Sequence, residues 1–231
     1  MLYGRVNVPI GIALRAQGES PGSGQDVDVL VTGPSGRTWR APAFEDTESV
    51  FRARFAAPEP GRYAWRSACA GKAGGLDGLE GRLEAAPYEG ASPLYRRGRL
   101  RVAAAHRTLE HEDGTPFLWL ADTWWMGLTT RLDWPHGFRH LVADRVRKGF
   151  NAVQIVAGPL PDYCATIGTW DPGQANEAGW PWIERPGRDP KAEPEPRDFT
   201  RPNPAFYDIA DLRIACLVEA GIVPCIVSMW G

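Results

Sequence analysis

Two features are missing from this sequence: an excess of charge of one sign and a long apolar run. Of its 231 residues, 26 are Lys or Arg and 28 are Asp or Glu, so the formal net charge is −2. A chain without a basic excess lacks the electrostatic signature of nucleic-acid binding. No stretch reaches the ~18 consecutive apolar residues that a membrane-spanning helix needs. We therefore expect neither nucleic acid nor a membrane as a partner.

The N-terminal segment also lacks the parts of a secretory signal. The apolar stretch from Val8 to Leu14 is short and contains Pro9 and Gly11. It has no charged segment before it and no small-residue cleavage site after it. We therefore expect a cytoplasmic protein, unless the true start lies upstream.

Metal-binding and cofactor-binding patterns are absent as well. The four cysteines show no C-x-x-C spacing and stand at Cys69, Cys164, Cys216 and Cys225. His136 and His140 are four residues apart, but no Glu follows His136 to complete a zinc-protease motif. No G-x-S-x-G, P-loop or G-x-G-x-x-G pattern follows a predicted strand. We expect neither a metal ion nor a cofactor.

Glycine, proline and tryptophan are abundant, with 26, 21 and 10 residues. Many turn residues together with many aromatic rings are typical of a β-rich protein with long loops. In residues 1–88, short segments of period-two alternation are separated by turn signals, and the clearest of these segments is 51–55. This spacing predicts an antiparallel β-sandwich with Phe51, Phe55 and Trp65 in its core.

Residues 89–110 read as a connector with a run of basic residues. The run comprises Arg96, Arg97, Arg99 and Arg101. Such a run is compatible with an anion-binding site, but a solvated strand face is the favoured interpretation.

From residue 111 the hydrophobic pattern changes to strands that alternate with helices. Residues 117–121 and 150–156 are apolar runs typical of buried strands, and 222–229 forms a third. Helical spacing fills 133–149 and 203–221. This order predicts right-handed βαβ units and a parallel sheet over residues 111–231.

A loop of about 45 residues, 158–203, separates the second predicted strand from the second helix, a length that indicates either function or disorder. Its first half contains Trp170, Trp180 and Trp182. Its acidic residues have no predicted rigid support and are Asp162, Asp171, Glu177 and Glu184.

The residues that could bind a ligand stand at the ends of the predicted parallel strands. Asp122 ends the first strand and precedes Trp124 and Trp125, so a carboxylate that binds sugar hydroxyls would lie beside two rings that can stack on a sugar. A helix-capping or loop-tethering role for Asp122 stays open. Trp230, at the end of the third strand, is assigned to stacking or to core packing. Gln154 lies inside the second strand. Its side chain either donates a hydrogen bond to a ligand or is a buried amide whose hydrogen bonds are made within the protein.

These segments resemble a known family. The run D-G-T-P-F-L-W-L-A-D-T-W-W at 113–125 looks like the first barrel strand of the apiosidase-like glycoside hydrolases. The run K-G-F-N-A-V-Q at 148–154 resembles their second strand. N-P-A-F-Y at 203–207, A-G-I-V-P at 220–224 and M-W-G at 229–231 resemble their second helix and third strand.

The first part of the chain fits the same family. Residues 51–55 and P-G-R-Y-A-W at 60–65 are similar to the Ig-like module that precedes the barrel in many members. The resemblance implies an Ig-like β-sandwich over 1–88, a connector over 89–110, and the N-terminal part of a (β/α)8 barrel over 111–231.

The resemblance also implies the hydrolysis of glycosidic bonds in plant-type polysaccharides by two carboxylates. These are expected after the fourth and seventh barrel strands, and hence beyond Gly231. Because a barrel needs ~200–250 residues, 111–231 would be an incomplete barrel of three β/α units, with the missing remainder as its partner.

Two functional hypotheses follow from these observations. The first is the N-terminal portion of a glycoside hydrolase that acts on polysaccharide side chains and binds its carbohydrate substrate through Asp122, Trp124, Trp125, Gln154 and Trp230. The alternative is a non-catalytic carbohydrate-binding or interaction fragment in which the sandwich is the binding part.

Overall fold

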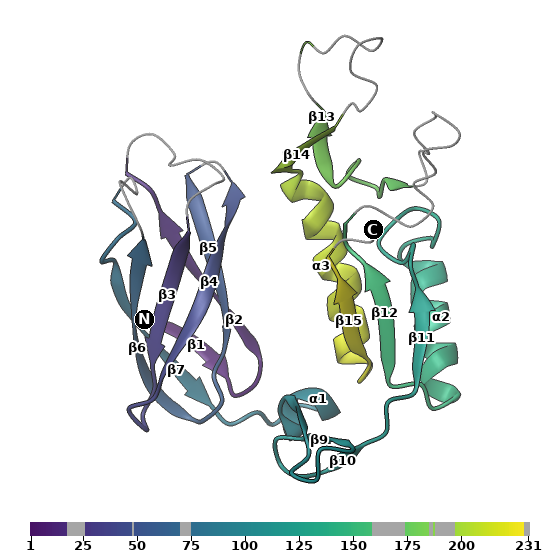
Figure 1. Cartoon of the computed structure of the whole chain (residues 1–231), viewed down its shortest axis with the longest axis horizontal. Helices are drawn as coiled ribbons and strands as arrows, with labels where there is room; N and C mark the ends of the chain where they lie inside the picture. Colours follow the sequence, from purple (N-terminus) through teal and green to yellow (C-terminus); the bar gives the residue numbers. More distant parts are fainter. Residues whose placement is uncertain are drawn as a thin grey trace. The chain divides into compact units, whose positions relative to one another are not determined.

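The computed structural model describes residues 1–17, 26–47, 49–69, 75–158, 174–184, 187 and 197–228. The chain forms two compact units, which we describe separately (Figure 1). The first unit comprises Met1–Arg101 and His111–Thr115, and the second comprises Val102–Glu110 and Pro116–Gly231. The domain boundaries expected at residues 88 and 110 stay a prediction.

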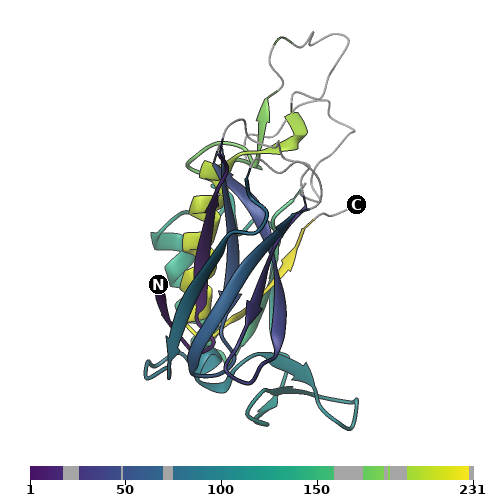
Figure 2. The same ribbon diagram turned by 90° about the vertical axis from the view of Figure 1, so that its left-hand side faces the viewer.

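Seven strands build the first unit. They are β1 (Leu2–Arg5), β2 (Pro9–Arg15), β3 (Val27–Thr32), β4 (Thr38–Thr47), β5 (Val50–Ala56), β6 (Gly61–Cys69) and β7 (Glu80–Ala86). They form one sheet in the order β1-β7-β6-β3-β4-β5-β2 (Figures 1 and 2). All neighbours are antiparallel except β1 and β7, which are parallel. The edge strands β1 and β2 contact each other, so the sheet is nearly closed.

The period-two alternation of these strands places one face of the sheet inside. In β5, Phe51, Ala53 and Phe55 are buried, whereas Arg54 is exposed. Phe51 and Phe55 therefore lie in the core as predicted, and Trp65 is partly buried against the same core. Enclosure of this apolar face supplies the stabilisation of the unit.

Short elements follow the seven-stranded sheet in the chain. Helix α1 (Pro93–Arg97) is followed by β8 (Leu100–Val102), β9 (Leu109–His111) and β10 (Pro116–Phe117), which form a small sheet in the order β10-β9-β8. Among the described residues, no helix combines the length and the apolar character needed to cross a membrane.

The second unit contains a parallel sheet with two helices. Its elements are β11 (Ala121–Trp124), α2 (His136–Arg147), β12 (Ala152–Val156), β13 (Trp182–Glu184), β14 (Arg197–Pro202), α3 (Pro204–Glu219) and β15 (Val223–Val227). Strands β11, β12 and β15 pair in parallel in that order, and β13 pairs with β14 antiparallel. The predicted parallel order of the three strands is therefore observed.

One face of the parallel sheet packs against both helices. Trp124 of β11 and Ile155 of β12 lie in one core with Phe138 and Val142 of α2 and Leu217 of α3. Because side chains alternate along a strand, Asp122 points to the same face as Trp124.

The expected fold class, an antiparallel β-sandwich followed by three β/α units of a TIM-type barrel, is wrong. The described residues are mostly β, with a nearly closed seven-stranded mixed sheet and three helices, α1 to α3. The three parallel strands form an open sheet, not a barrel surrounded by helices (Figure 1).

The error has a physical cause. Period-two alternation predicts one inward and one outward face, and this is equally true of two stacked sheets and of one sheet curled on itself. A strand–helix–strand pattern specifies local parallel neighbours. Barrel closure depends on pairing between strands that are distant in the sequence, which this pattern does not specify.

We predict that Phe51→Ala lowers the free energy of unfolding by about 3–5 kcal/mol, because it leaves a cavity at a side chain that is 2% exposed. Phe44→Ala is the matched control, since Phe44 of the neighbouring strand is 40% exposed; its cost should stay below about 1 kcal/mol. Urea unfolding of both variants measures the difference. Equal losses would show that the inward face is assigned incorrectly.

Candidate functional site

A hollow of about 510 Å³ lies at the C-terminal end of β11. Its walls come from β11, the segment that follows it, and helix α2. The lining residues are Asp122, Thr123, Trp124, Trp125, Met126, Gly127, Arg131, Leu132, Leu141 and Arg145. The volume is within the range of small-ligand sites, and both indoles and three charged side chains border it.

Three of the five predicted binding residues meet at this hollow, namely Asp122, Trp124 and Trp125. Gln154 does not line it. In the parallel ladder Gln154 pairs with Thr123 and Cys225, while its neighbours Val153 and Ile155 are buried against the helices. Strand alternation therefore directs Gln154 to the opposite face of the sheet. Trp230 lies outside the described residues.

The Asp122 carboxylate accepts three hydrogen bonds. The Thr123 amide donates to Oδ1 at 2.8 Å, and Trp124 Nε1 donates to Oδ2 at 2.9 Å. Arg145 Nε of α2 also donates to Oδ2 and forms an ion pair there. The carboxylate thus orients the Trp124 indole and ties β11 to α2, which is the tethering role left open by the sequence.

These contacts determine the charge of Asp122. Burial is the largest single influence and disfavours ionisation, but the donors Arg145, Trp124 and Thr123 together outweigh it and lower the pKa of the Asp122 carboxyl below its ordinary value. The ion pair raises the pKa of Arg145 in return. At neutral pH Asp122 is an ionised acceptor, and it cannot serve as a proton donor.

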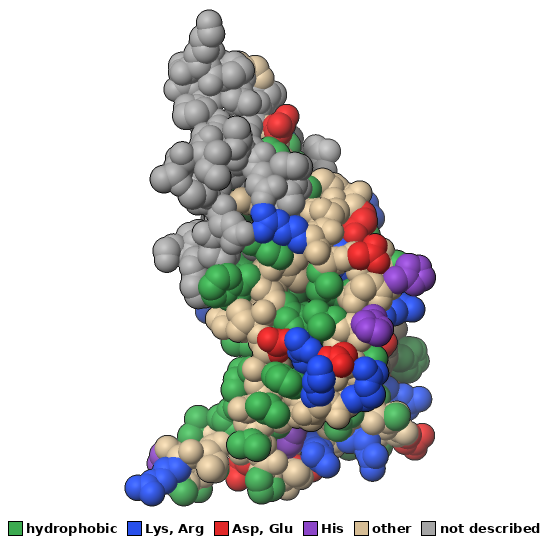
Figure 3. Space-filling model, turned by 90° about the vertical axis from the view of Figure 1, so that its right-hand side faces the viewer, with side chains coloured by type: hydrophobic (Ala, Val, Ile, Leu, Met, Phe, Trp, Pro, Cys, Tyr) green, Lys and Arg blue, Asp and Glu red, His purple; other side chains and the backbone are tan. Residues whose placement is uncertain are grey.

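Further charges surround Arg145 on α2. Asp144 Oδ2 accepts from Arg145 Nη1 at 2.6 Å and from Lys148 Nζ at 2.8 Å, and Oδ1 accepts from Arg147 at 3.2 Å. Acidic and basic side chains adjoin one another in Figure 3, which views the molecule from the α2 side of Figure 1. This network fixes Arg145, and through it Asp122.

The two tryptophans differ in exposure. Trp124 is 6% exposed and makes an edge contact with Phe138, with ring centroids 5.5 Å apart. Trp125 is 38% exposed. Trp125 is therefore the more accessible of the two indoles, whereas Trp124 is mainly a core residue.

A buried arginine holds the segment that carries the hollow. Arg213 of α3 is 0% exposed, and its Nη1 donates to the carbonyl oxygens of Gly127, Thr129 and Leu132 at 3.0, 3.2 and 2.7 Å. Its Nη2 donates to Glu177 Oε1 at 2.8 Å. The guanidinium thus fixes residues 127–132, and with them Arg131 and Leu132 of the hollow.

A side chain at position 127 would be crowded. A Cβ there would lie 2.6 Å from Ile155 Cδ1 and 3.0 Å from the Trp124 carbonyl oxygen. The backbone can therefore approach β12 closely enough to present its carbonyl to Arg213.

Sequence reasoning missed Arg145, Arg213 and the fixed position of Glu177. We expected no rigid support for Glu177, yet Arg213 holds it. The overlooked signal is Arg213 at helical spacing with Phe206, Ala210 and Leu217, because a cation within an apolar stripe requires buried partners. The acidic residues Asp162 and Asp171 of the same loop lie outside the described residues.

No cluster of three or more metal-ligating side chains occurs in the described part of the chain.

A hollow at a strand end, lined by indoles and charged groups, defines a candidate small-ligand site in an α/β unit. A sequence model described as the apiosidase-like catalytic domain matches residues 103–231, more than half of the chain. The chain therefore belongs to the apiosidase-like family.

Comparison with solved structures adds a fold relative. A crystal structure of a candidate glycoside hydrolase from Bacteroides vulgatus ATCC 8482 has a TM-score of 0.73 and 16% sequence identity. The match covers 99% of this chain and 41% of that one, so the chain spans less than half the length of this neighbour. At this sequence identity the similarity between the two proteins shows only a shared fold.

A second structure, the Lin-41 filamin domain, matches 36% of this chain and 84% of its own length at 13% identity, but with a TM-score of 0.29. No curated protein matches the chain.

We predict that Asp122→Asn destabilises the protein most at neutral pH. The folded-state pKa of Asp122 is lowered, so its contribution is present above the unfolded-state pKa of about 3.9 and is lost as the pH falls through the folded-state pKa. Unfolding free energies of both proteins should therefore converge below about pH 4. Asp208→Asn on α3 removes an exposed carboxylate and is the control. An equal effect of both variants would contradict the role of the ion pair.

We predict that Arg213→Met lowers the free energy of unfolding by about 3 kcal/mol, because three carbonyls and Glu177 lose a buried donor. Arg147→Met on α2, with a side chain 65% exposed, is the matched control and should change little. Denaturant unfolding provides the comparison. Similar curves for the two variants would mean that Arg213 does not anchor residues 127–132.

Proposed function

We propose that this chain is part of a glycoside hydrolase of the apiosidase-like family that acts on side chains of plant-type polysaccharides. Family membership rests on the match over residues 103–231. The single observation that carries the proposal is the hollow at the end of β11, where the half-exposed ring of Trp125 adjoins an ionised carboxylate and two arginines.

The hollow has the chemistry of a sugar subsite. A pyranose or furanose presents an apolar face that stacks on an indole, together with hydroxyls that pair with charged groups. Trp125 supplies the ring, and Asp122, Arg131 and Arg145 supply polar groups at the rim. In this proposal Trp230 adds a second stacking ring. Gln154 faces away from the hollow and takes no part in this subsite.

Hydrolysis also needs a carboxyl group that can donate a proton. Glycosidases use two carboxyl groups, one of which donates a proton to the leaving group. Asp122 is the one acidic residue among the described residues that line the hollow, and three donors keep it ionised. The proposal therefore assigns Asp122 to binding and assigns the acid–base step to other carboxyl groups.

The unsuitability of Asp122 as a proton donor also favours the alternative, a non-catalytic carbohydrate-binding chain. A hydrolase releases sugar from its substrate, whereas a carbohydrate-binding chain does not. Binding without release of sugar by the product of the complete reading frame would support the alternative.

We predict that Trp125→Ala weakens sugar binding by about tenfold, as expected when a stacking ring is lost. The assay follows tryptophan fluorescence and reducing-sugar release with branched pectic oligosaccharides, using the product of the complete reading frame. Trp119→Ala is the matched control, because Trp119 is 44% exposed and lies outside the hollow. Equal effects of both variants, or no effect of Trp125→Ala, would contradict the subsite.

A further inference from the structure

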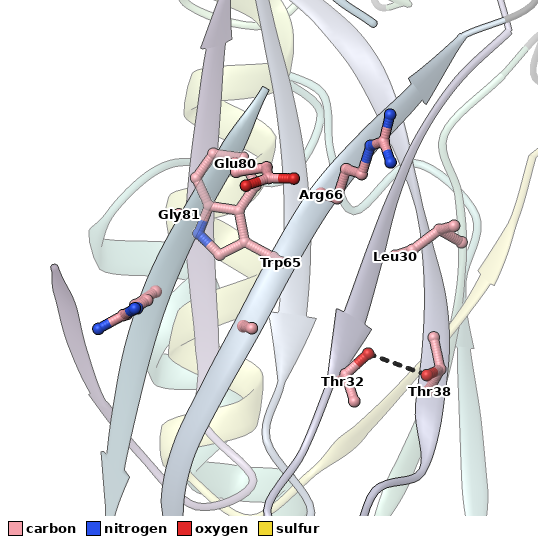
Figure 4. Close-up of a pocket in the computed structure, with 9 residues that line it drawn as sticks. Leu30, Thr32, Thr38, Trp65, Arg66, Glu80 and Gly81 are labelled. Carbon is pink, nitrogen blue, oxygen red and sulfur yellow. Dashed lines mark hydrogen bonds between the residues drawn. The ribbon is translucent and has the colours of Figure 1, made fainter. Parts of the chain in front are cut away.

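A second hollow, of about 680 Å³, lies on the seven-stranded sheet of the first unit. It is lined by Leu30, Thr32, Thr38, Ala64, Trp65, Arg66, Glu80, Gly81 and Arg82 (Figure 4). None of these residues belongs to the site at β11, so the inference below is independent of the proposed hydrolysis.

The strand register explains the shape of this hollow. One cross-strand row on the outer face consists of Thr38, Thr32, Ala64 and Arg82, in that order across β4, β3, β6 and β7. The small side chain of Ala64 lies between the longer ones of Thr32 and Arg82. The outer surface of the sheet therefore has a depression at Ala64, where a ligand can approach the backbone.

A glycine shapes the neighbouring position in β7. A Cβ at Gly81 would lie 2.3 Å from the Trp65 ring, so this ring occupies the space of the missing side chain. Trp65 packs partly against the core. The indole thus supports the β6–β7 pair beside the hollow.

The adjacent row supplies charge and an apolar contact. Across β3, β6 and β7 it consists of Leu30, Arg66 and Glu80. Leu30 is 39% exposed. Together with Arg82, the lining therefore has two guanidinium groups, one carboxylate and an exposed aliphatic side chain.

The two arginines of the hollow are available for a ligand. On the same outer face Arg40 pairs with Asp28 at 2.7 Å, and Arg62 lies 3.7 Å from Glu84. In contrast, Arg66 stands opposite Glu80 in register without forming an ion pair, and among the described residues Arg82 has no side-chain partner either. Unpaired guanidinium groups with planar donor geometry recognise carboxylates.

Hydroxyl groups lie at the other side of the hollow. Thr32 Oγ1 and Thr38 Oγ1 share one hydrogen bond of 2.9 Å, drawn as a dashed line in Figure 4. One hydroxyl hydrogen remains free in this pair, as do acceptor lone pairs. Glu80 adds an acceptor for ligand hydroxyls. A ligand that matches this lining carries a carboxylate, several hydroxyls and an apolar face.

We propose that this hollow is a non-catalytic binding site for a carboxylate-bearing glycan, with uronic acid units as its ligand class. The carboxylate pairs with Arg66 and Arg82, ring hydroxyls bond to Thr32, Thr38 and Glu80, and the apolar sugar face rests on Ala64 and Leu30. An acidic peptide would satisfy the arginines but would leave the hydroxyl groups unmatched.

The test is affinity electrophoresis of the full chain in gels that contain polygalacturonate. We expect retardation of the wild type, and a dissociation constant about tenfold higher for the double variant Arg66→Ala/Arg82→Ala. Arg15→Ala/Arg54→Ala is the matched control, because it removes the same charge from β2 and β5, away from the hollow. Ala64→Leu fills the hollow without a change of charge and should weaken binding similarly. Circular dichroism confirms that each variant is folded.

Four results would overturn the proposal. These are no retardation of the wild type, equal loss in the control pair, undiminished binding by Ala64→Leu, and equal retardation by neutral galactan or by polyglutamate. Because this assay measures no turnover, its outcome is separate from that of the hydrolysis experiment.

Discussion

The second unit depends on one buried guanidinium. Arg213 is fully enclosed, so its charge needs a counter-charge and its donors need acceptors. Nη1 and Nη2 have acceptors, whereas Nε has none among the described residues. Glu177 supplies the charge, and the three carbonyls between Gly127 and Leu132 supply acceptors. The rings of Trp134 and Phe138 lie 5.5 and 5.6 Å from the guanidinium carbon. A single side chain of α3 thereby holds the segment after β11, which forms part of the wall of the hollow.

The electrostatic environment of Asp122 suits ligand binding but does not suit proton donation. A carboxylate that accepts three hydrogen bonds, one of them from a guanidinium, is stabilised in its charged form. Such a group is suited to hold sugar hydroxyls and unsuited to donate a proton. The Asp122–Arg145–Asp144 chain therefore supports a binding role at β11 and leaves acid–base chemistry to other residues.

The first unit shows how a nearly closed sheet acquires an outer surface for binding. Most of its apolar residues turn inward, so the outer face is mainly polar, with a few exposed apolar side chains such as Leu30. Where Arg40 and Arg62 meet acidic neighbours, the face is neutralised. Around Ala64, Arg66 and Arg82 have no ion-pair partner among the residues that the structure describes, and we propose that the face binds a ligand there.

The sequence by itself determined the local features of this protein. Period-two alternation placed Phe51 and Phe55 inside, and strand–helix alternation predicted the parallel order of β11, β12 and β15. The D-T-W-W run contributes four of the residues that line the hollow. These features depend on residues that are close in the chain. Only the tertiary structure decided that the first seven strands form one mixed sheet, that three parallel strands form an open sheet, that Gln154 faces away from Asp122, and that Arg213 binds Gly127 from 86 residues away. Strand closure and buried ion pairs join distant segments, and the pattern of neighbouring residues contains no information about which distant segments meet.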